Sequence, residues 1–166
     1  MTPAACGAST STRVYSSPKG NDRAVKAARA NSIPIRTQGQ TNWTVRVLTD
    51  WALTRNTKLL PEEKPFSSTF YELSVAEMDF WLSRFVLEVR KANGDPYPPN
   101  SLYQLVCGLQ RCLRNHGFGN IKLFEDSAFH GFRSTLDGEM KRLNATTLTK
   151  NKLNQLHQTK KTVYGS

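Results

Sequence analysis

The side chains that carry most enzyme chemistry are scattered along this sequence without a shared motif. The three histidines are His116, His130 and His157, and none has a nucleophile or a carboxylate in a motif that would pair with it. They are better explained as surface or packing residues. No GxxxxGK[ST] phosphate loop occurs, so nucleotide hydrolysis is not supported.

The cysteines and the acidic pairs lead to the same result. Cys6, Cys107 and Cys112 form no CxxC pattern and no Cys/His cluster with zinc spacing, which indicates neither a metal site nor a disulfide framework. Glu62-Glu63 lies in a proline-containing connection and Glu125-Asp126 precedes a predicted helix, so solubility and helix capping explain both pairs. We therefore expect no cofactor, no metal and no catalytic site.

Basic side chains are the remaining candidates for function, and they are unevenly distributed. The 166 residues carry a formal charge of +10. Residues 1–40 hold six Lys or Arg against one acidic residue, residues 41–126 hold ten of each sign, and residues 127–166 hold seven basic groups against two acidic ones. A neutral middle with basic flanks favours a polyanionic partner, nucleic acid first and an anionic membrane second, although a solvated basic tail is the common alternative.

The helix that organises the chain is predicted between Tyr97 and Gly117. Pro98 and Pro99 suit its first turn, Asn100 and Ser101 can bond the free amides there, and Gly117 suits the left-handed closing position. One face of this helix is apolar at helical spacing and should meet the core. Its members are Leu102, Leu105, Val106, Leu109 and Leu113.

Three further amphipathic helices are predicted around it. The first has Thr41 as its cap and ends near Asn56. The second begins at a capping box, Ser74 to Glu77, and runs to about Lys91. The third follows Asp126 as cap and runs from Ser127 to about Leu143, and a fifth, marginal helix is expected in the tail. No convincing period-two run appears, so the predicted fold is all-α, a bundle of four or five helices.

The segments outside this bundle differ from it in composition. Residues 1–38 are rich in Ser, Thr, Ala and Gly and predict a disordered basic leader, with one or two helical turns at Ala24 to Ala30. Residues 39–145 form the helical domain, and residues 146–166 a basic tail. There is no signal-peptide core and no apolar run of membrane-spanning length, so we expect no membrane partner.

The candidate binding residues are the polar side chains that fall off the apolar stripes of two helices. The alternative is that these side chains are ordinary solvent-exposed residues that keep the bundle soluble and bind no ligand. The candidates are Gln104, Arg111 and Arg114 on the central helix, and Arg133, Lys141 and Arg142 on the helix after Asp126.

The run from Glu72, ELSVAEMDFWLSRFVLEVRKANGDPYPPNSLYQLVCGLQRCLRNHG, with FEDSAFHGFRSTLDGEMKRL after it and TNWTVRVLTDWALTRN before it, closely resembles a domain of animal proteins. That domain occurs in glutamine-rich protein 1-like and zinc-finger MYM-type proteins and is similar to Crypton-type tyrosine recombinases. The resemblance spans about Thr41 to Leu143. It implies the core-binding part of such a recombinase, a SAM-like helical bundle that clamps one side of a DNA duplex in a nuclear protein.

The resemblance leaves out the part of a recombinase that cuts DNA. The catalytic arginine, lysine, His-x-x-Arg pair and tyrosine have no counterpart here, and Tyr164 lacks the surrounding motif. The tail from Ala145 onward departs from the family and is interpreted as the truncated start of a catalytic domain. We therefore predict a non-catalytic module that binds double-stranded DNA. The alternative is a nuclear protein-interaction domain that uses exposed side chains such as Phe80 or Tyr103.

Overall fold

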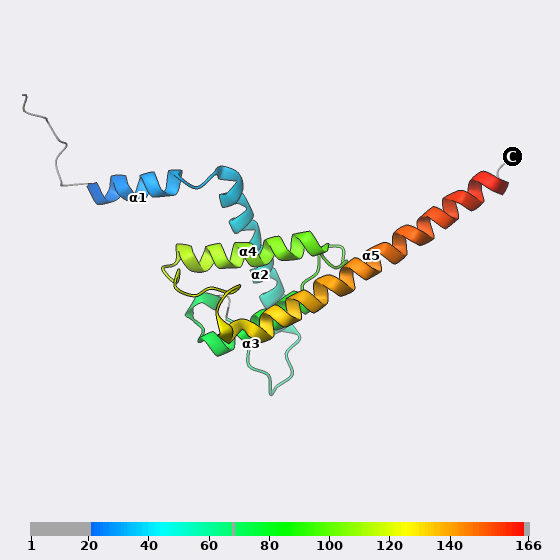
Figure 1. Ribbon diagram of the computed structural model, residues 1–166. Helices are drawn as coiled ribbons and strands as arrows, with labels where there is room; N and C mark the ends of the chain where they lie inside the picture. Colours follow the sequence, from blue (N-terminus) through cyan, green and yellow to red (C-terminus); the bar gives the residue numbers. More distant parts are fainter. Residues whose placement is uncertain (1–20, 68, 165–166) are drawn as a thin grey trace, which may run out of the picture. The chain divides into compact units, whose positions relative to one another are not determined.

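The computed structural model describes residues 21–67 and 69–164 (Figure 1). These residues form five α-helices, two short 3-10 helices and no strand, which confirms the predicted all-α class. The elements are α1 (Asn21–Asn31), α2 (Ile35–Thr57), η1 (Phe70–Glu72), α3 (Val75–Glu88), α4 (Pro99–Asn115), η2 (Ser127–Phe129) and α5 (His130–Tyr164). No helix among them is both long and apolar enough to cross a bilayer.

The chain divides into two units between Ile35 and Arg36. Helix α1 belongs to the first unit, and its residues 22–31 are exposed. This helix extends the one or two turns predicted at Ala24 to Ala30. Residues 1–20 of the predicted leader, including Cys6, lie outside the described residues.

The start of α2 corrects the prediction that Thr41 caps the first core helix. The helix begins six residues earlier, and Thr41 is a buried internal residue whose hydroxyl donates to the carbonyl of Thr37 at 3.0 Å. A threonine that bonds the preceding turn in this way is compatible with the middle of a helix. The sequence signal that was missed is Pro34, which stands immediately before the first helical residue.

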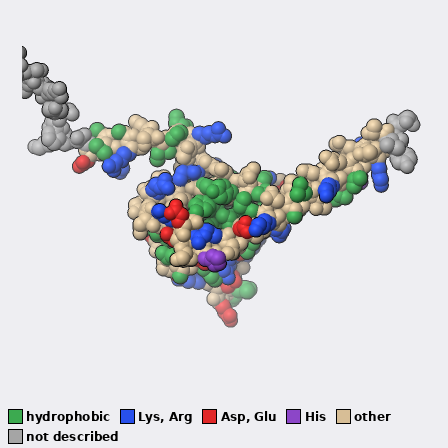
Figure 2. Space-filling view, in the orientation of Figure 1, with side chains coloured by type: hydrophobic (Ala, Val, Ile, Leu, Met, Phe, Trp, Pro, Cys, Tyr) green, Lys and Arg blue, Asp and Glu red, His purple; other side chains and the backbone are tan. Residues whose placement is uncertain are grey.

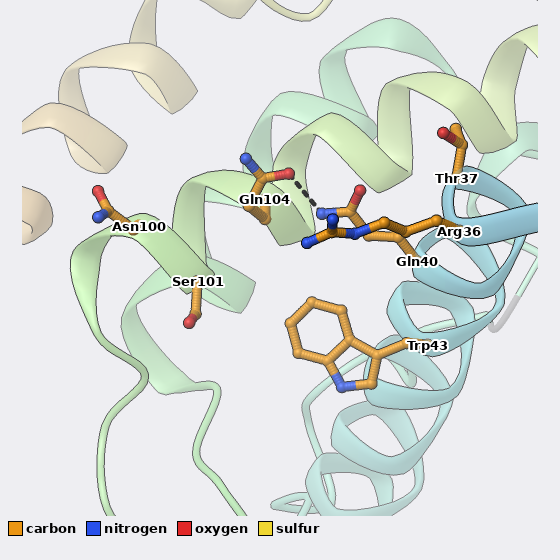
Figure 3. A pocket seen from close by; sticks show the side chains of 7 residues that line it. All are labelled: Arg36, Thr37, Gln40, Trp43, Asn100, Ser101 and Gln104. Carbon is orange, nitrogen blue, oxygen red and sulfur yellow. Dashed lines mark hydrogen bonds between the residues drawn. The ribbon is translucent and has the colours of Figure 1, made fainter. Parts of the chain in front are cut away.

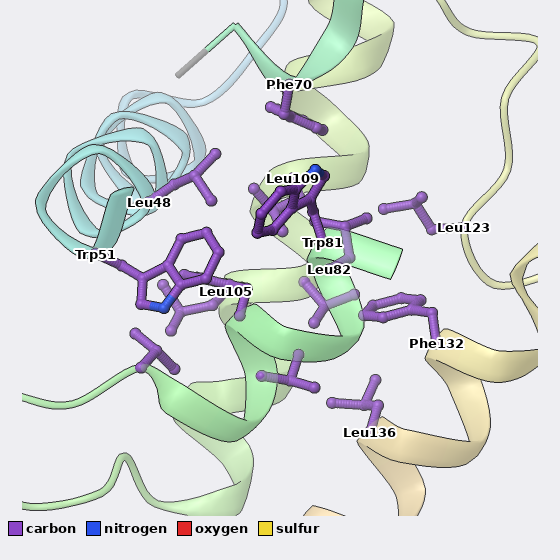
Figure 4. Packing of buried hydrophobic residues seen from close by; sticks show 14 of the residues in the cluster. Leu48, Trp51, Phe70, Trp81, Leu82, Leu105, Leu109, Leu123, Phe132 and Leu136 are labelled. Atoms are coloured by element: carbon purple, nitrogen blue, oxygen red, sulfur yellow. The ribbon is translucent and has the colours of Figure 1, made fainter. Parts of the chain in front are cut away.

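Edge-to-face aromatic contacts hold the core of the second unit together. Figure 4 shows part of this core, with Trp51, Trp81 and the leucines around them. The ring of Trp51 from α2 lies 5.1 Å from Phe66 and 5.3 Å from Phe85, and Phe66 lies 5.5 Å from Trp81 of α3. Such pairs each add about 0.5–1.5 kcal/mol beyond the burial of their area. The predicted connection between α2 and α3 is therefore anchored, because Phe66 within it is 3% exposed.

Helix α3 begins as the sequence predicted. The Ser74 hydroxyl accepts the backbone N–H of Glu77, and the Glu77 carboxylate accepts the backbone N–H of Ser74, which completes the capping box. The helix ends at Glu88, slightly before the predicted Lys91, because Val89 is extended. Gly94 then takes a left-handed φ of 84°, and this segment returns the chain towards α4.

Helix α4 keeps its predicted apolar face and its closing glycine but not its predicted N-terminal caps. Leu105 and Leu109 are fully buried, and Gly117 closes the helix with a left-handed φ of 88°. Its first turn follows Pro98 and has no side-chain cap, so the predicted capping by Asn100 or Ser101 is wrong. Both residues lie inside the first turn, beyond the capping position.

The helix predicted from Ser127 starts as the 3-10 helix η2, and α5 itself begins at His130 and continues much further than predicted. Asp126 does not cap it, because the Asp126 carboxylate instead accepts the backbone N–H of Lys122 at 2.8 Å. The predicted end at Leu143 is wrong, since the helix continues to Tyr164 with no Gly or Pro to stop it. The predicted fifth helix is this continuation. Residues 144–162 are all exposed, so that part of α5 packs against nothing in the described chain.

Helices α2 and α4 cross so closely that Gly108 has no room for a side chain. A Cβ atom there would lie 2.0 Å from the Thr44 hydroxyl oxygen and 2.7 Å from the Thr44 Cβ, and Thr44 is fully buried. A rotamer change cannot remove a clash with a Cβ atom. The helix crossing therefore requires glycine at this position.

Replacing this glycine tests the crossing. Gly108→Ala should destabilise the protein by about 1–3 kcal/mol in urea denaturation, because overpacking outweighs the better helix propensity of alanine. Gly138→Ala is the matched control, since Gly138 on α5 has nothing within 4 Å. It should be neutral or stabilising by up to about 1 kcal/mol. Equal effects of the two changes would contradict the close crossing.

The capping box makes a separate prediction about acid. Hydrogen bonds from Lys64 and Ser74 lower the pKa of Glu77 from 4.5 to about 2. Because this pKa is depressed by folding, the contribution of Glu77 to stability is complete above about pH 4.5 and is lost as the pH falls towards 2. An NMR titration of the carboxyl carbons should show this low midpoint for Glu77. Lys64→Ala should raise it, whereas an unchanged midpoint would refute the cause.

Candidate nucleic-acid interface

A pocket of about 650 Å³ lies where the first turns of α2 and α4 meet (Figure 3). Figure 3 shows Arg36 and Gln40 reaching from α2 towards Gln104 on α4, with the Trp43 ring below them. The Gln40 amide donates a hydrogen bond to the Gln104 side-chain oxygen. The lining residues are Arg36, Thr37, Gln40, Trp43, Asn100, Ser101 and Gln104, none of them acidic.

The electrostatics of this pocket are positive. The guanidinium of Arg36 has no hydrogen bond or acidic partner among the described residues, and the side chain is exposed. The backbone amides in the first turn of α4 are not capped by a side chain. A helix start carries a partial positive charge from its aligned peptide dipoles. The pocket is thus suited chemically to an anionic oxygen.

Arg111 lies beside this pocket but is occupied by α2. Its Nε atom donates to the Thr41 hydroxyl at 3.1 Å, and a terminal nitrogen donates to the Gln40 side-chain oxygen at 3.0 Å. Gln40 therefore bridges Gln104 and Arg111, and the structure brings these two predicted residues together. Because the early start of α2 covers this face of α4, Arg111 is half-buried rather than free.

Arg114 is the predicted residue of α4 that remains free. It is exposed, and no hydrogen bond or ion pair holds its guanidinium among the described residues. One helical turn separates it from Arg111.

The three predicted residues of α5 are all engaged. Arg133 donates to the carbonyl oxygens of Asp126 at 2.5 Å and Leu123 at 3.3 Å, so it ties the connector before α5 to the helix. Lys141 pairs with Asp137 at 2.6 Å. No hydrogen bond or ion pair joins these residues to the α4 candidates in the described chain.

Arg142 makes the strongest of these contacts. Two of its nitrogens donate to the two oxygens of the Glu139 carboxylate, at 2.8 and 2.7 Å, and Glu139 is only 5% exposed. This carboxylate raises the pKa of Arg142 through its hydrogen bonds. Arg142 thus neutralises a buried charge, which limits what it can offer a ligand.

Sequence reasoning missed Arg36, Gln40 and Trp43 as lining residues. The prediction that the first core helix begins after Thr41 leaves Arg36 in the leader and gives Trp43 only a role in the core. Recognising Pro34 as the residue before a helix would have put all three on one side of α2, at helical spacing.

The groups considered for catalysis stay apart. The His116 ring stacks on Tyr71 with a centroid distance of 4.0 Å, and its Nδ1 atom lies 2.8 Å from the Cys112 carbonyl oxygen. His130 and His157 are exposed. Within residues 21–67 and 69–164, no three His, Cys, Asp or Glu side chains are grouped to hold a metal ion.

Residues 39–143 match the family model of the QRICH1 domain. Zinc finger MYM-type protein 3 of Homo sapiens is 34% identical over 79 residues, which cover 47% of this chain and 6% of that protein. Zinc finger MYM-type protein 2 of Pongo abelii is 33% identical over 64 residues, covering 39% of this chain and 5% of that protein. The chain therefore spans only a small part of these relatives. No solved structure matches it.

Two substitutions test whether Arg111 stabilises the fold while Arg114, on the same helix, does not. Arg111→Ala should cost about 1–2 kcal/mol in urea denaturation, because it leaves the side-chain oxygens of half-buried Gln40 and buried Thr41 without this donor. Arg114→Ala should change stability by less than about 0.5 kcal/mol, because nothing depends on that side chain. Equal costs would mean that the bridge from α4 to α2 contributes nothing.

Proposed function

The chain belongs to the QRICH1 domain family, and we propose that it is a non-catalytic module that binds double-stranded DNA with little sequence preference. The observation that carries the proposal is the α2–α4 pocket, which has a free arginine, several amide and hydroxyl groups and no carboxylate. Arginines, amides, hydroxyls and helix starts are the groups that contact DNA phosphates. The pocket would hold a backbone phosphate, with Arg36 and Gln104 as its contacts.

Additional cations extend the surface available to a polyanion. Arg114 lies on the same helix as Gln104, and the exposed second half of α5 contains no acidic residue from 144 to 164. Figure 2 shows basic side chains, all of them lysines, along that part of α5 without acidic ones beside them. Its lysines are Lys150, Lys152, Lys160 and Lys161.

The engaged residues have a smaller part in this proposal. The three predicted basic residues of α5 contribute to the local positive potential. A phosphate contact by any of them requires breaking its present hydrogen bond or ion pair. They are Arg133, Lys141 and Arg142. Among the six predicted DNA-binding residues, we therefore propose Gln104 and Arg114 as direct contacts. Arg111 instead positions Gln40 at the edge of the pocket.

The resemblance to the core-binding part of Crypton-type recombinases belongs to the same proposal. It supports a module that holds one side of a duplex and acts in the nucleus. The zinc finger MYM-type relatives support the coarser point that this domain is a small part of larger proteins.

A protein-interaction module is the second candidate, favoured by exposed aromatic side chains. Phe80 is 46% exposed, with the Arg84 guanidinium 3.4 Å above its ring, and Tyr103 is 42% exposed. These two side chains belong to different helices. Binding through them should depend only weakly on salt.

Salt dependence tests the DNA proposal. The full chain should bind a short fluorescent duplex so that log affinity falls with log salt at a slope of about −3 to −4, because each neutralised phosphate releases a counterion. Arg36→Ala and Arg114→Ala should each flatten that slope by about one. The measurement is fluorescence anisotropy at several salt concentrations.

The control removes a cation that already has a partner. Lys122 forms an ion pair with Glu125 at 2.7 Å, so Lys122→Ala changes net charge equally and should leave the slope unchanged. If Lys122→Ala lost DNA binding while Arg36→Ala kept it, the phosphate contact would not lie at the α2–α4 pocket. Binding that ignores salt would overturn the proposal.

A further inference from the structure

A second cavity, of about 610 Å³, lies between α2 and the segment that follows α3. We call it the 88–97 groove. Trp43 lines both this groove and the α2–α4 pocket. The size of the groove is that of a typical ligand pocket. The walls include Trp43, Arg46, Asp50, Trp51, Lys58, Glu88, Arg90, Lys91 and Tyr97.

Four cations line the groove, and none has an acidic partner among the described residues. Arg46, Lys58 and Lys91 make no side-chain hydrogen bond there, and Arg90 donates only to the carbonyl oxygens of Leu87 and Val89, at 2.9 and 2.8 Å. Some other surface cations of the bundle, such as Lys64, are paired. The groove thus gathers four cations that no ion pair among the described residues neutralises.

Two carboxylates also line the groove, but one is already neutralised. Glu88 accepts from a terminal nitrogen of Arg55 at 2.5 and 2.6 Å and from the Trp51 ring N–H at 3.1 Å. Asp50 has no ion pair in the described chain, and it contributes with burial to raising the pKa of Tyr97. Four cations therefore face one uncompensated carboxylate.

Aromatic rings give the groove a rigid apolar side. Trp43 and Tyr97 meet edge to face with a centroid distance of 5.9 Å, and both are partly exposed. Trp51 lies deeper, at 8% exposure, and is fixed by Phe66 and Phe85. A ligand side chain that enters between the cations would meet ring surface.

We propose that the 88–97 groove binds an acidic peptide segment of a partner protein, in which Asp or Glu residues flank an aromatic or aliphatic side chain. The carboxylates would meet Arg46, Lys58, Arg90 and Lys91, and the apolar side chain would pack on Trp43 and Tyr97. This site shares only Trp43 with the α2–α4 pocket, and its charged contacts are different residues, so the proposal does not depend on whether the chain binds DNA.

The uncompensated carboxylate of Asp50 favours a peptide over a nucleic acid. A duplex presents its phosphates on a convex surface and cannot enter a cavity walled by rings. A single strand carries a phosphate at every nucleotide, and Asp50 would repel a phosphate placed beside it, since like charges brought together cost binding energy. A peptide can place a neutral residue, or a backbone N–H, opposite Asp50.

Selection of peptides by the full chain tests this assignment. The probe is a phage-displayed library of short random peptides, from which the enriched sequences are synthesised with a fluorescent label. We expect acidic residues around one aromatic or aliphatic position. The variant K58E/K91E should weaken binding of the selected peptide by at least about tenfold, because it reverses two of the four contacts.

The matched control is R23E/K26E, which changes the net charge equally at two exposed residues of α1 that do not line the groove. It should retain binding within about twofold. Thermal unfolding of both variants checks that they are folded. Three results would each overturn the proposal. The first is enrichment of peptides without acidic residues, and the second is an equal loss of peptide binding in both variants. The third is displacement of the peptide by single-stranded or duplex DNA, if that DNA does not bind K58E/K91E.

Discussion

The close crossing of α2 and α4 at Gly108 and Thr44 is the constraint on which the functional surfaces depend. Because the two backbones approach so closely there, the side chains one turn away on either helix must meet. Gln40 thereby reaches both Gln104 and Arg111, and the first turns of the two helices enclose a polar pocket. A wider crossing would leave those polar groups to solvent as separate side chains.

A second constraint acts at the other end of α2, where Arg55 lies against two tryptophan rings. Its guanidinium carbon is 6.0 Å from the centre of the Trp51 ring and 5.2 Å from that of Trp81, and it neutralises Glu88. Cation–π contacts of partly buried groups contribute about 0.5–2 kcal/mol. One consequence is structural, because α2 is tied to α3. Another is electrostatic, because the groove beside Glu88 keeps an excess of positive charge.

The two concave surfaces along α2 differ in what lines them, although Trp43 belongs to both. The α2–α4 pocket has one free arginine, neutral donors and no acid, which suits a phosphate. The 88–97 groove has four cations, aromatic walls and a remaining carboxylate, which suits a chain of mixed charge and apolar character. The net charge of +10 does not reveal these two surfaces, because most of it comes from the segments that flank the bundle. The positive surfaces arise from how the charges of a nearly neutral bundle are arranged.

The sequence by itself determined the all-α class, the apolar faces, the capping box at Ser74 and the closing glycine at Gly117, because these depend on spacing and on local hydrogen bonds. It also singled out Gln104, which lines the α2–α4 pocket, and Arg111, which bonds Gln40 beside it. It misplaced the start of α2, where Pro34 is the start signal, and the end of α5, where no Gly or Pro stands between Leu143 and Tyr164. Only the tertiary structure decided which cations are free. Whether Arg142 faces solvent or neutralises Glu139, and whether Arg114 or Arg111 is occupied, depends on which neighbours the packed helices supply.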